Sequence, residues 1–174
     1  FDKRSKFVHY HPRTAVLNNL EFDHADIFEN LDAIKKQFHH FVRTIPGDGL
    51  IVKNGEDENI NDVIELGCWS QTAAIHQCHQ AGHNDDDWSL GKTSEDGKYF
   101  EVLLDGKMVA SVNWSLHGLH NRMNALAAIA AAQHAGVPVE LSCEALNEFK
   151  GIKRRLEVRG VVNEITVYDD FAHH

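Results

Sequence analysis

Residues 14–53 read TAVLNNLEFDHADIFENLDAIKKQFHHFVRTIPGDGLIVK, and this stretch decides the fold class of the chain. Its first five residues are a short apolar run that ends in polar residues, which is the pattern of a buried strand followed by a loop. Its last five, Gly49–Lys53, form a second apolar run. Between the two runs, apolar residues recur at intervals of three and four, which predicts an amphipathic helix capped by Asn30 or Asp26 and ended by a Pro-Gly pair. The apolar positions of this helix are Leu31, Ile34, Phe38, Phe41, Val42 and Ile45. A strand, a helix and a strand in this order indicate a parallel α/β sheet.

The middle of the chain continues this alternation and adds an antiparallel element. A short helix is expected over Asn59–Leu66. From Trp88 to Trp114 apolar and polar residues alternate, and Asp105-Gly106 stands between two apolar runs, which is a strong signal for a two-residue hairpin. The Ala-rich run Leu119–Ala135 predicts a helix that packs closely on the sheet and stops at Gly136. We therefore expect an α/β fold with a mostly parallel central sheet, flanking helices and an inserted antiparallel ribbon.

The last part of the chain changes character after a glycine. A further helix is predicted over Glu140–Phe149, and Gly151 separates it from a basic segment. Beyond it, two runs over Glu157–Val161 and Ile165–Tyr168 have the pattern of strands that open a new unit. We therefore divide the chain into two domains, residues 1–151 and residues 152–174.

Composition and charge exclude several classes of protein. With 174 residues, of which 43% are hydrophobic, the chain can form one main globular core. Its net charge of −9 disfavours non-specific binding to nucleic acid or to anionic lipid. The three cysteines form no CxxC pair, and reduced thiols are expected. The sequence contains neither a signal peptide nor an apolar run of the roughly 20 residues that cross a bilayer, so a cytoplasmic location is expected. The acidic stretch His79–Asp87 is expected to be an exposed loop.

The first cluster of candidate functional residues follows the first strand. Glu21, Asp23, His24 and Asp26 lie within six residues of one another. In an open α/β sheet, ligands bind at the carboxyl ends of the strands. Carboxylate oxygens suit Mg²⁺, and an imidazole nitrogen can complete a mixed site. The alternative is that one of the acids caps the next helix while His24 only forms a hydrogen bond within the loop.

The second cluster stands where the Ala-rich helix begins, over Gly118–Asn124. Asn121 and Asn124 are three residues apart and share one helix face. A carboxamide offers both a donor and an acceptor, which matches the N6 and N7 edge of adenine. The alternative is that Asn121 or His120 is a helix cap.

The third cluster lies near the C-terminus. Arg154 and Arg155 could pair with phosphate oxygens, and Asp169 could accept hydrogen bonds from ribose hydroxyl groups. These residues could equally be a solvated basic face and the end of a strand. Thirteen histidines invite a zinc-binding interpretation, but HExxH, GxSxG and paired CxxC motifs are all missing from the sequence.

Taken in order, three segments resemble the ATP-dependent muramyl ligase family. They are TAVLNNLEFDHADIF, WSLHGLHNRMNALAAIAAA and RRLEVRGVVNEITVYDDFAHH. The family carries an Asn-x-Glu-x-Asp-His loop and a Gly-x-His-Asn-x-x-Asn-Ala helix start in its central domain, and the resemblance extends over essentially the whole chain. It implies a three-domain enzyme in which ATP phosphorylates the carboxylate of UDP-N-acetylmuramate and an amine then displaces the phosphate. The wording of the segments favours a member that adds the tripeptide L-Ala-γ-D-Glu-meso-diaminopimelate. An L-alanine-adding member and a non-catalytic module that binds divalent metal are the alternatives.

The resemblance also implies roles for individual residues. At the magnesium ion and the reacting phosphates it implies roles for His24, Glu21, Asp23 and Arg155. At the adenine and ribose of ATP it implies roles for His120, Asn121, Asn124 and Asp169. His24 and Arg155 are the two expected to act in catalysis. The chemistry then depends on positioning and on the charges of Mg²⁺ and arginine, without a protein nucleophile.

Three departures from the family pattern limit what the chain should do by itself. The sequence contains no GxxxxGK[ST] phosphate loop. Where several relatives carry a carbamylated lysine, the aligned position is His39, with Lys35 and Lys36 a turn earlier. The amine-binding domain would follow His174. We therefore expect the isolated chain to be inactive as a ligase and to bind nucleotide weakly, although its three clusters should converge at one edge of the sheet.

Overall fold

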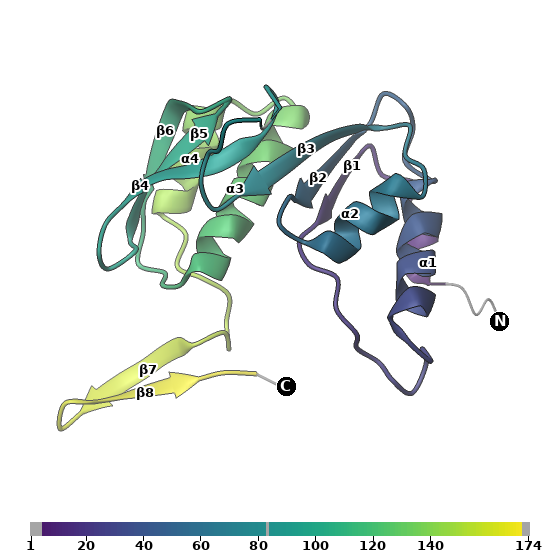
Figure 1. Cartoon of the computed structure of the whole chain (residues 1–174). Helices are drawn as coiled ribbons and strands as arrows, with labels where there is room; N and C mark the ends of the chain where they lie inside the picture. The colour runs from purple at the N-terminus through teal and green to yellow at the C-terminus, as the bar shows by residue number, and fades with distance from the viewer. Residues whose placement is uncertain (1–4, 83, 172–174) are drawn as a thin grey trace.

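The computed structural model describes residues 5–82 and 84–171 and confirms the predicted fold class (Figure 1). Its main unit is a six-stranded sheet in the order β1-β2-β3-β4-β5-β6. The strands are β1 (Thr14–Leu17), β2 (Leu50–Asn54), β3 (Gln71–His76), β4 (Trp88–Thr93), β5 (Tyr99–Leu104) and β6 (Lys107–Asn113). The helices are the 3₁₀ helix η1 (Lys6–His9), α1 (Leu31–Val42), α2 (Glu58–Glu65), α3 (Leu119–His134) and α4 (Val139–Asn147).

The first four strands are parallel to one another, and β4 is also the first strand of the antiparallel ribbon that β5 and β6 complete. β1, β2 and β3 pair in parallel, and β4 joins β3 in parallel through two residue pairs. β5 is antiparallel to both of its neighbours. The turn from β5 to β6 has positive φ at Asp105 (51°) and Gly106 (66°), as a type I′ hairpin turn requires. The hairpin that the Asp-Gly pair predicts is therefore confirmed.

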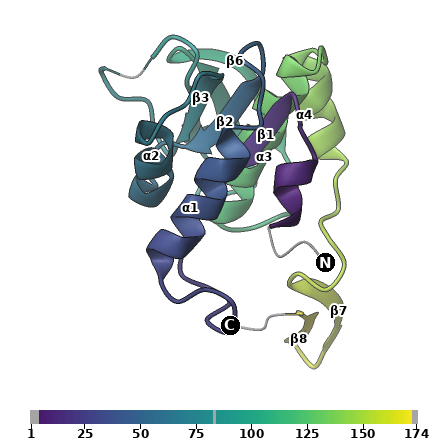
Figure 2. The same cartoon turned by 90° about the vertical axis from the view of Figure 1, so that its right-hand side faces the viewer.

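Helices cover both faces of the sheet and create two cores (Figure 2). α1 and α2 pack on one face around Leu17, Ile51 and Ile60, whereas α3 and α4 pack on the other around Val52 and other buried residues. Neighbouring residues of β2 thus point into different cores, because side chains alternate along a strand. Of the two caps considered for α1, Asn30 is the one used, since its side chain accepts a hydrogen bond from the Ala33 N–H.

Two details of the middle segment differ from the sequence-based expectation. The strand β3, with the sequence QTAAIH, is not predicted, because two alanines and polar ends give it neither β propensity nor an alternating pattern. The stretch 79–87 is expected to be exposed, yet its last residue, Asp87, is buried. Asp87 Oδ1 accepts the backbone N–H of Ala74 (2.8 Å), and its Oδ2 accepts that of Asn84 (2.9 Å). The acid therefore ties the end of this loop to β3.

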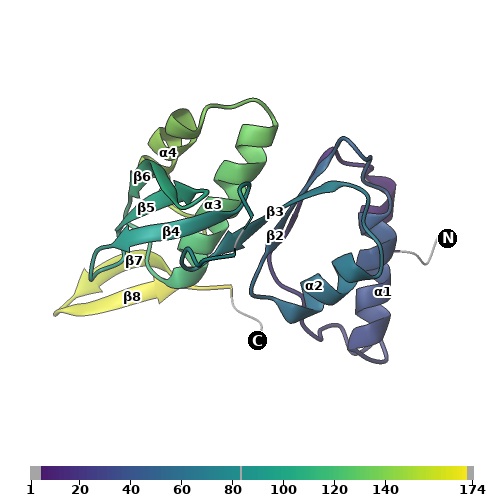
Figure 3. The ribbon, with the colours of Figure 1, turned by 45° about the horizontal axis from the view of Figure 1, so that its top comes forward.

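The strands β7 (Glu157–Val162) and β8 (Ile165–Asp169) form a separate antiparallel hairpin (Figures 1 and 3). Their turn has positive φ at Asn163 (51°) and Glu164 (65°). Apolar side chains on both strands are exposed, including Val161 and Ile165. The hairpin is thus joined to the main unit through the chain around Gly151, not through a shared core.

Candidate functional site

The loop after β1 is held at its root by the first turn of α2. The backbone N–H of Leu20 donates to Asp57 Oδ2 (2.9 Å), and the Leu20 carbonyl accepts from Asn59 Nδ2 (2.9 Å). The other oxygen of Asp57 caps α2 by accepting the Ile60 N–H (3.0 Å). Leu20 itself is buried in the core under α1 and α2. The segment that follows Leu20, which carries the first cluster, therefore starts from a fixed point.

Within the first cluster, the structure places Asp23 and His24 side by side. The Asp23 Oδ1 atom accepts the His24 backbone N–H (2.6 Å), and the His24 ring Nε2 lies 3.8 Å from Asp23 Oδ2. His24 has a positive φ of 54°, and its carbonyl accepts N–H groups from the next turn, those of Ile27 (2.8 Å) and Phe28 (3.0 Å). Neither Asp23 nor Asp26 caps α1, because Asn30 does. The imidazole of His24 is two-thirds exposed, so it can reach a ligand.

Donors for a metal ion are only partly assembled in this loop. Carboxylate and imidazole groups suit Mg²⁺ chemically. Over residues 5–82 and 84–171, however, no three His, Cys, Asp or Glu side chains form a group that could hold a metal ion. Glu21 is engaged at one oxygen by Asn19 Nδ2 (3.4 Å). A metal role for Glu21, Asp23 and His24 thus stays a prediction that needs further ligand oxygens from outside these residues.

The second cluster is ordered at the start of α3. The N-cap of α3 is Gly118, with φ of 90°, and it has no side-chain cap. Asn121 instead donates its Nδ2 to the His117 carbonyl (2.7 Å). A Cβ on Gly118 would lie 2.8 Å from the His120 ring, so that ring sits against the bare glycine backbone. The alternative in which Asn121 or His120 caps the helix is therefore wrong.

A hydrogen bond joins the residue that follows β1 to the second cluster. Asn18, the residue after β1, donates its Nδ2 to Asn124 Oδ1 (2.9 Å) across 106 residues of chain. At the other end of the same pair of elements, Thr14 Oγ1 lies 2.7 Å from His134 Nδ1. α3 therefore runs antiparallel to β1, and its N-terminus lies at the carboxyl edge of the parallel strands, where ligands bind in such sheets.

The third cluster lies on the hairpin and in the segment just before it, and it is built from local contacts. The Arg155 N–H donates to the Ile152 carbonyl (3.2 Å), and its side chain is exposed. Asp169 Oδ2 lies 3.9 Å from Arg159 Nε. The backbone N–H of Arg154 lowers the pKa of the Glu157 carboxyl, and the guanidinium of Arg159 adds to this effect. The charged residues of this segment thus contact one another within the hairpin and its approach.

The predicted convergence of all three clusters is met only in part. Figures 1 and 2 show the loop between β1 and α1 and the β7–β8 hairpin on the same side of the sheet. In the part of the chain that the structure describes, however, no hydrogen bond or ion pair joins His24, Asn121 and Arg155. Asn18, which precedes the first cluster, contacts Asn124 of the second, while Arg155 and Asp169 have the local contacts described above.

Two cavities lie along the same edge but use other residues. One, of about 340 Å³, opens at the ends of β2 and β3. It is lined by Lys53, Gly55, Asn61, Thr72, Ala74, His76, Gly82, Asn84 and Asp87. The other, of about 600 Å³, lies beside the end of β6. Its lining is Lys98, Asn113, Trp114, Ser115, Asn147, Glu148, Phe149 and Lys150. Sequence reasoning missed both, because their linings come from segments without a common motif.

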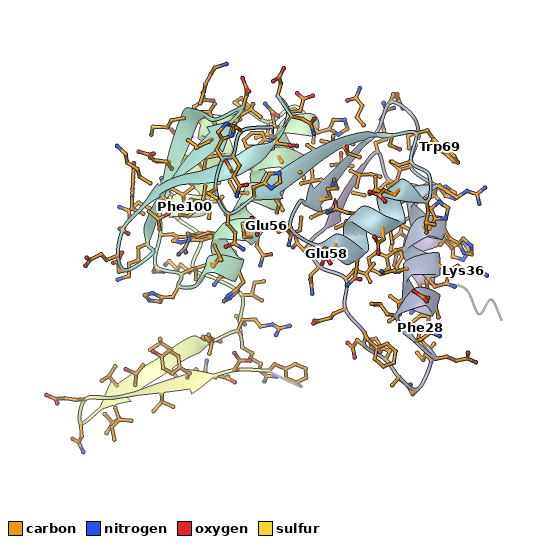
Figure 4. The ribbon with its side chains drawn as sticks, viewed as in Figure 1. Phe28, Lys36, Glu56, Glu58, Trp69 and Phe100 are labelled. Carbon is orange, nitrogen blue, oxygen red and sulfur yellow. The ribbon has the colours of Figure 1, made fainter. Side chains whose placement is uncertain are left out.

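Two basic residues of the helix α1, Lys35 and His39, make contacts within the fold. Lys35 Nζ pairs with Asp62 Oδ2 of α2 at 2.6 Å, and the ring Nε2 of His39 lies 3.2 Å from the Gly67 carbonyl. Lys36 is exposed and points away from the sheet (Figure 4). Lys35 is thus engaged in packing α1 against α2, and His39 fixes the loop after α2.

Comparisons with known proteins agree with this geometry. Residues 2–132 match the family model described as the Mur ligase middle domain. The chain is 53% identical, over its whole length, to the UDP-N-acetylmuramate–L-alanyl-γ-D-glutamyl-meso-2,6-diaminoheptandioate ligase of Escherichia coli K12, and it spans 36% of that protein. It is 38% identical to the UDP-N-acetylmuramate–L-alanine ligase of Caldanaerobacter subterraneus, with 97% of the chain and 36% of the relative covered.

A solved structure shows the same fold. The crystal structure of UDP-N-acetylmuramate:L-alanyl-γ-D-glutamyl-meso-diaminopimelate ligase from Neisseria meningitidis superimposes with a TM-score of 0.78 at 55% identity. The match covers 88% of this chain and 45% of that one. The chain therefore spans less than half of the length of each of these three proteins. Within its described part, no helix has the length and apolar character needed to cross a lipid bilayer.

Proposed function

This chain belongs to the Mur ligase family through its match to the middle domain, and from that premise we propose that it is the nucleotide-binding part of a tripeptide ligase. The proposed enzyme uses ATP to join UDP-N-acetylmuramate to L-Ala-γ-D-Glu-meso-diaminopimelate. The observation that carries this proposal is the 53% identity, over the full length of the chain, to the ligase whose name specifies this tripeptide. The edge that Asn18 and Asn124 share is the structural feature that such a role would use.

The proposed reaction has two steps. In the first, the carboxylate oxygen of UDP-N-acetylmuramate attacks the γ-phosphorus of ATP, so that an acyl phosphate forms and ADP leaves. In the second, the amino group of the tripeptide attacks the acyl carbon, an amide bond forms, phosphate leaves, and the amine gives up a proton. Both steps concentrate negative charge on phosphoryl oxygens, which fixed positive charge and donors stabilise. No side chain of the protein needs to form a covalent bond.

Within this reaction we assign roles to the residues of the three clusters. Asn121 and Asn124 contact the adenine, with His120 packed beside them. The exposed guanidinium of Arg155 pairs with phosphate oxygens. The carboxylate of Asp169 accepts hydrogen bonds from the ribose. Because Asp169 lies on the separate hairpin and Arg155 just before it, this assignment requires the hairpin to approach the edge at which α3 begins.

The remaining assignments concern the metal ion, the domains and the location. Mg²⁺, when bound, supplies positive charge to the phosphate oxygens. Glu21, Asp23 and His24 are the residues of this chain that we assign to hold it, with nucleotide oxygens completing the donor set. We propose that residues 1–151 belong to the central domain and residues 152–174 open the next one. The reaction is assigned to the cytoplasm.

The L-alanine-adding ligase is the second candidate, because the relative of that name is 38% identical to the chain. A ligase assay on the full-length protein that contains this chain separates the two candidates. ADP release is measured with UDP-N-acetylmuramate and either the tripeptide or L-alanine. The tripeptide should give the higher kcat/KM. Equal or better use of L-alanine would replace the first proposal with the second.

Two variants in the basic segment test the site itself. Arg155→Ala should lower kcat by a factor of about 100 or more, since removal of one charge-stabilising donor costs that much in comparable sites. Lys153→Ala, an equally exposed change two residues away, is the matched control and should leave kcat within a factor of about two. If ADP release requires neither carboxylate nor amine substrate, the ligase proposal is wrong.

A further inference from the structure

We propose that the cavity at the ends of β2 and β3 is an anion-binding site, in which the ammonium group of Lys53 pairs with a carboxylate or phosphate group of a small ligand. The cavity measures about 340 Å³, which is enough room for a small organic molecule. Its lining includes none of the residues assigned above to ATP, Mg²⁺ or catalysis. The inference therefore goes beyond the proposed ligase reaction and does not depend on it.

The cavity lies on the face of the sheet that α1 and α2 cover. Lys53 of β2 is in register with Leu17 of β1, which is buried in the core under these helices, and with Ala74 of β3. Thr72 and His76 stand two residues to either side of Ala74, so they share its face of the sheet. Because Ala74 carries only a methyl group, it leaves room between its two larger neighbours.

Asn61 of α2 fixes the position of the Lys53 ammonium group. Its Nδ2 donates to the Gly55 carbonyl (3.1 Å), which turns its Oδ1 towards Lys53, and the Lys53 Nζ donates to that oxygen. An ammonium group has three N–H donors, and Asn61 takes one of them. The other two are left for a ligand in the cavity.

No carboxylate forms an ion pair with Lys53 in the part of the chain that the structure describes. Lys35, Lys98 and Lys107 each pair with a carboxylate, whereas Lys53 contacts a neutral carboxamide. The side chain of Lys53 is also half-buried. A charge in such a place is costly, because the loss of water is not offset by attraction to an opposite charge. An anionic ligand supplies the opposite charge.

Asp87, the acid of the lining, is engaged by other donors. Its two oxygens accept the backbone N–H groups of Ala74 and Asn84, and Oδ2 lies 3.6 Å from the ring Nε2 of His76. Asp87 immediately precedes β4, while Lys53 is on β2, so β3 lies between the two residues. The Lys53 end of the cavity therefore keeps its positive charge for a ligand.

Two further groups shape the cavity for an oxyanion. The hydroxyl of Thr72 forms no hydrogen bond within residues 5–82 and 84–171, and it can donate to a ligand. The ring of His76 lies against the backbone of Gly55, where a Cβ would be 2.1 Å from the ring Cε1. An ammonium group and a hydroxyl in one cavity can donate to two oxygens of the same carboxylate or phosphate.

The test measures binding of inorganic phosphate and of acetate to the full-length protein that contains this chain, by calorimetry with excess ADP present. Lys53→Met keeps the length of the side chain without its charge and should weaken binding by roughly tenfold or more, because charge-assisted hydrogen bonds are lost. Lys53→Arg keeps the charge and should bind more tightly than Lys53→Met. Thr72→Val removes only the hydroxyl and should weaken binding by a smaller factor. The matched control is Lys36→Met, an exposed lysine of α1, and it should leave the affinity unchanged. The tighter of the two probes identifies the preferred group.

The melting temperature gives a second measurement, because an anion that binds the folded protein raises it. The rise should be present in the parent and smaller in Lys53→Met. Equal affinity in these two proteins would show that the anion binds elsewhere and would overturn the inference, as would failure of both probes to bind the parent. If Lys53→Met does not fold, Thr72→Val decides in its place, since unchanged affinity there would count against the site. Binding that depends on Lys53 in a protein without ligase activity would refute only the proposed reaction.

Discussion

The carboxylate of Asp57 holds two elements together, and its removal should destabilise the main unit. In Asp57→Ala, α2 loses its N-cap, which costs about 1 kcal/mol in typical proteins. The N–H of Leu20 also loses its acceptor (2.9 Å) beside a buried side chain. An unpaired donor in such a place costs roughly 1–3 kcal/mol. The free energy of unfolding should therefore fall by roughly 2–4 kcal/mol.

Urea unfolding followed by circular dichroism measures this loss. Asp57→Asn keeps one oxygen, which can cap α2 but leaves an NH₂ group facing the Leu20 N–H, so its loss should be intermediate. Asp62→Ala lies in the same helix and removes only a partly exposed ion pair with Lys35, which is worth about 1 kcal/mol or less. The expected order of destabilisation is Asp57→Ala, Asp57→Asn, Asp62→Ala. If Asp57→Ala unfolds at the same urea concentration as Asp62→Ala, the hydrogen bond from the Leu20 N–H to Asp57 contributes nothing to stability, and the reasoning fails.

Four further outcomes follow from three single sites. Gly49→Ala should lower the free energy of unfolding by roughly 1–3 kcal/mol, because its Cβ would lie 2.8 Å from a backbone oxygen. The control is Gly47→Ala, whose Cβ would meet only an ordinary contact at 3.7 Å and should change urea unfolding little. Burial raises the pKa of Cys143 to about 11 from 9.0, so iodoacetamide at a pH of about 8 should label the exposed Cys78 and spare Cys143 until the protein unfolds. Because the buried thiol favours its neutral form, the stability that it contributes is complete below pH 9.0 and is lost as the pH rises to about 11, and a Cys143→Ala variant should lack this part of the decline. Glu164→Gly relieves a positive φ of 65° in the β7–β8 turn, and slower amide hydrogen exchange across the hairpin is the expected result.

The parts of the fold that were predictable carry local signals. The spacing of apolar residues and the Asn30 cap predict α1 from one continuous segment, and the Asp105-Gly106 pair predicts the β5–β6 hairpin. The core of the ribbon, where the ring centroids of Phe100 and Trp114 lie 5.4 Å apart, also follows from alternation. In contrast, β3 has small side chains that suit close packing under α3 and that leave no pattern to read.

The candidate site was predictable in its residue types but not in its contacts. His24, Asn121 and Asn124 stand in recognisable local clusters. Nothing local marks Asn18 as the partner of Asn124, because the two are 106 residues apart and meet only when α3 folds back across the sheet. The hydrogen bond between Leu20 and Asp57 is equally non-local. In the sequence, Asp57 looks like an ordinary helix cap.

Two hydrogen bonds join α3 to β1 and to the residue after it, and together they fix the number of residues between the paired positions. Four residue steps of strand separate Thr14 from Asn18, or about 13 Å at roughly 3.3 Å per residue. Ten residue steps of helix separate Asn124 from His134, or about 15 Å at roughly 1.5 Å per residue. One residue inserted into either element would shift one contact out of reach while the other stayed in place. Substitutions along β1 and α3 can keep this spacing, whereas an insertion or a deletion between Thr14 and Asn18, or between Asn124 and His134, would break it.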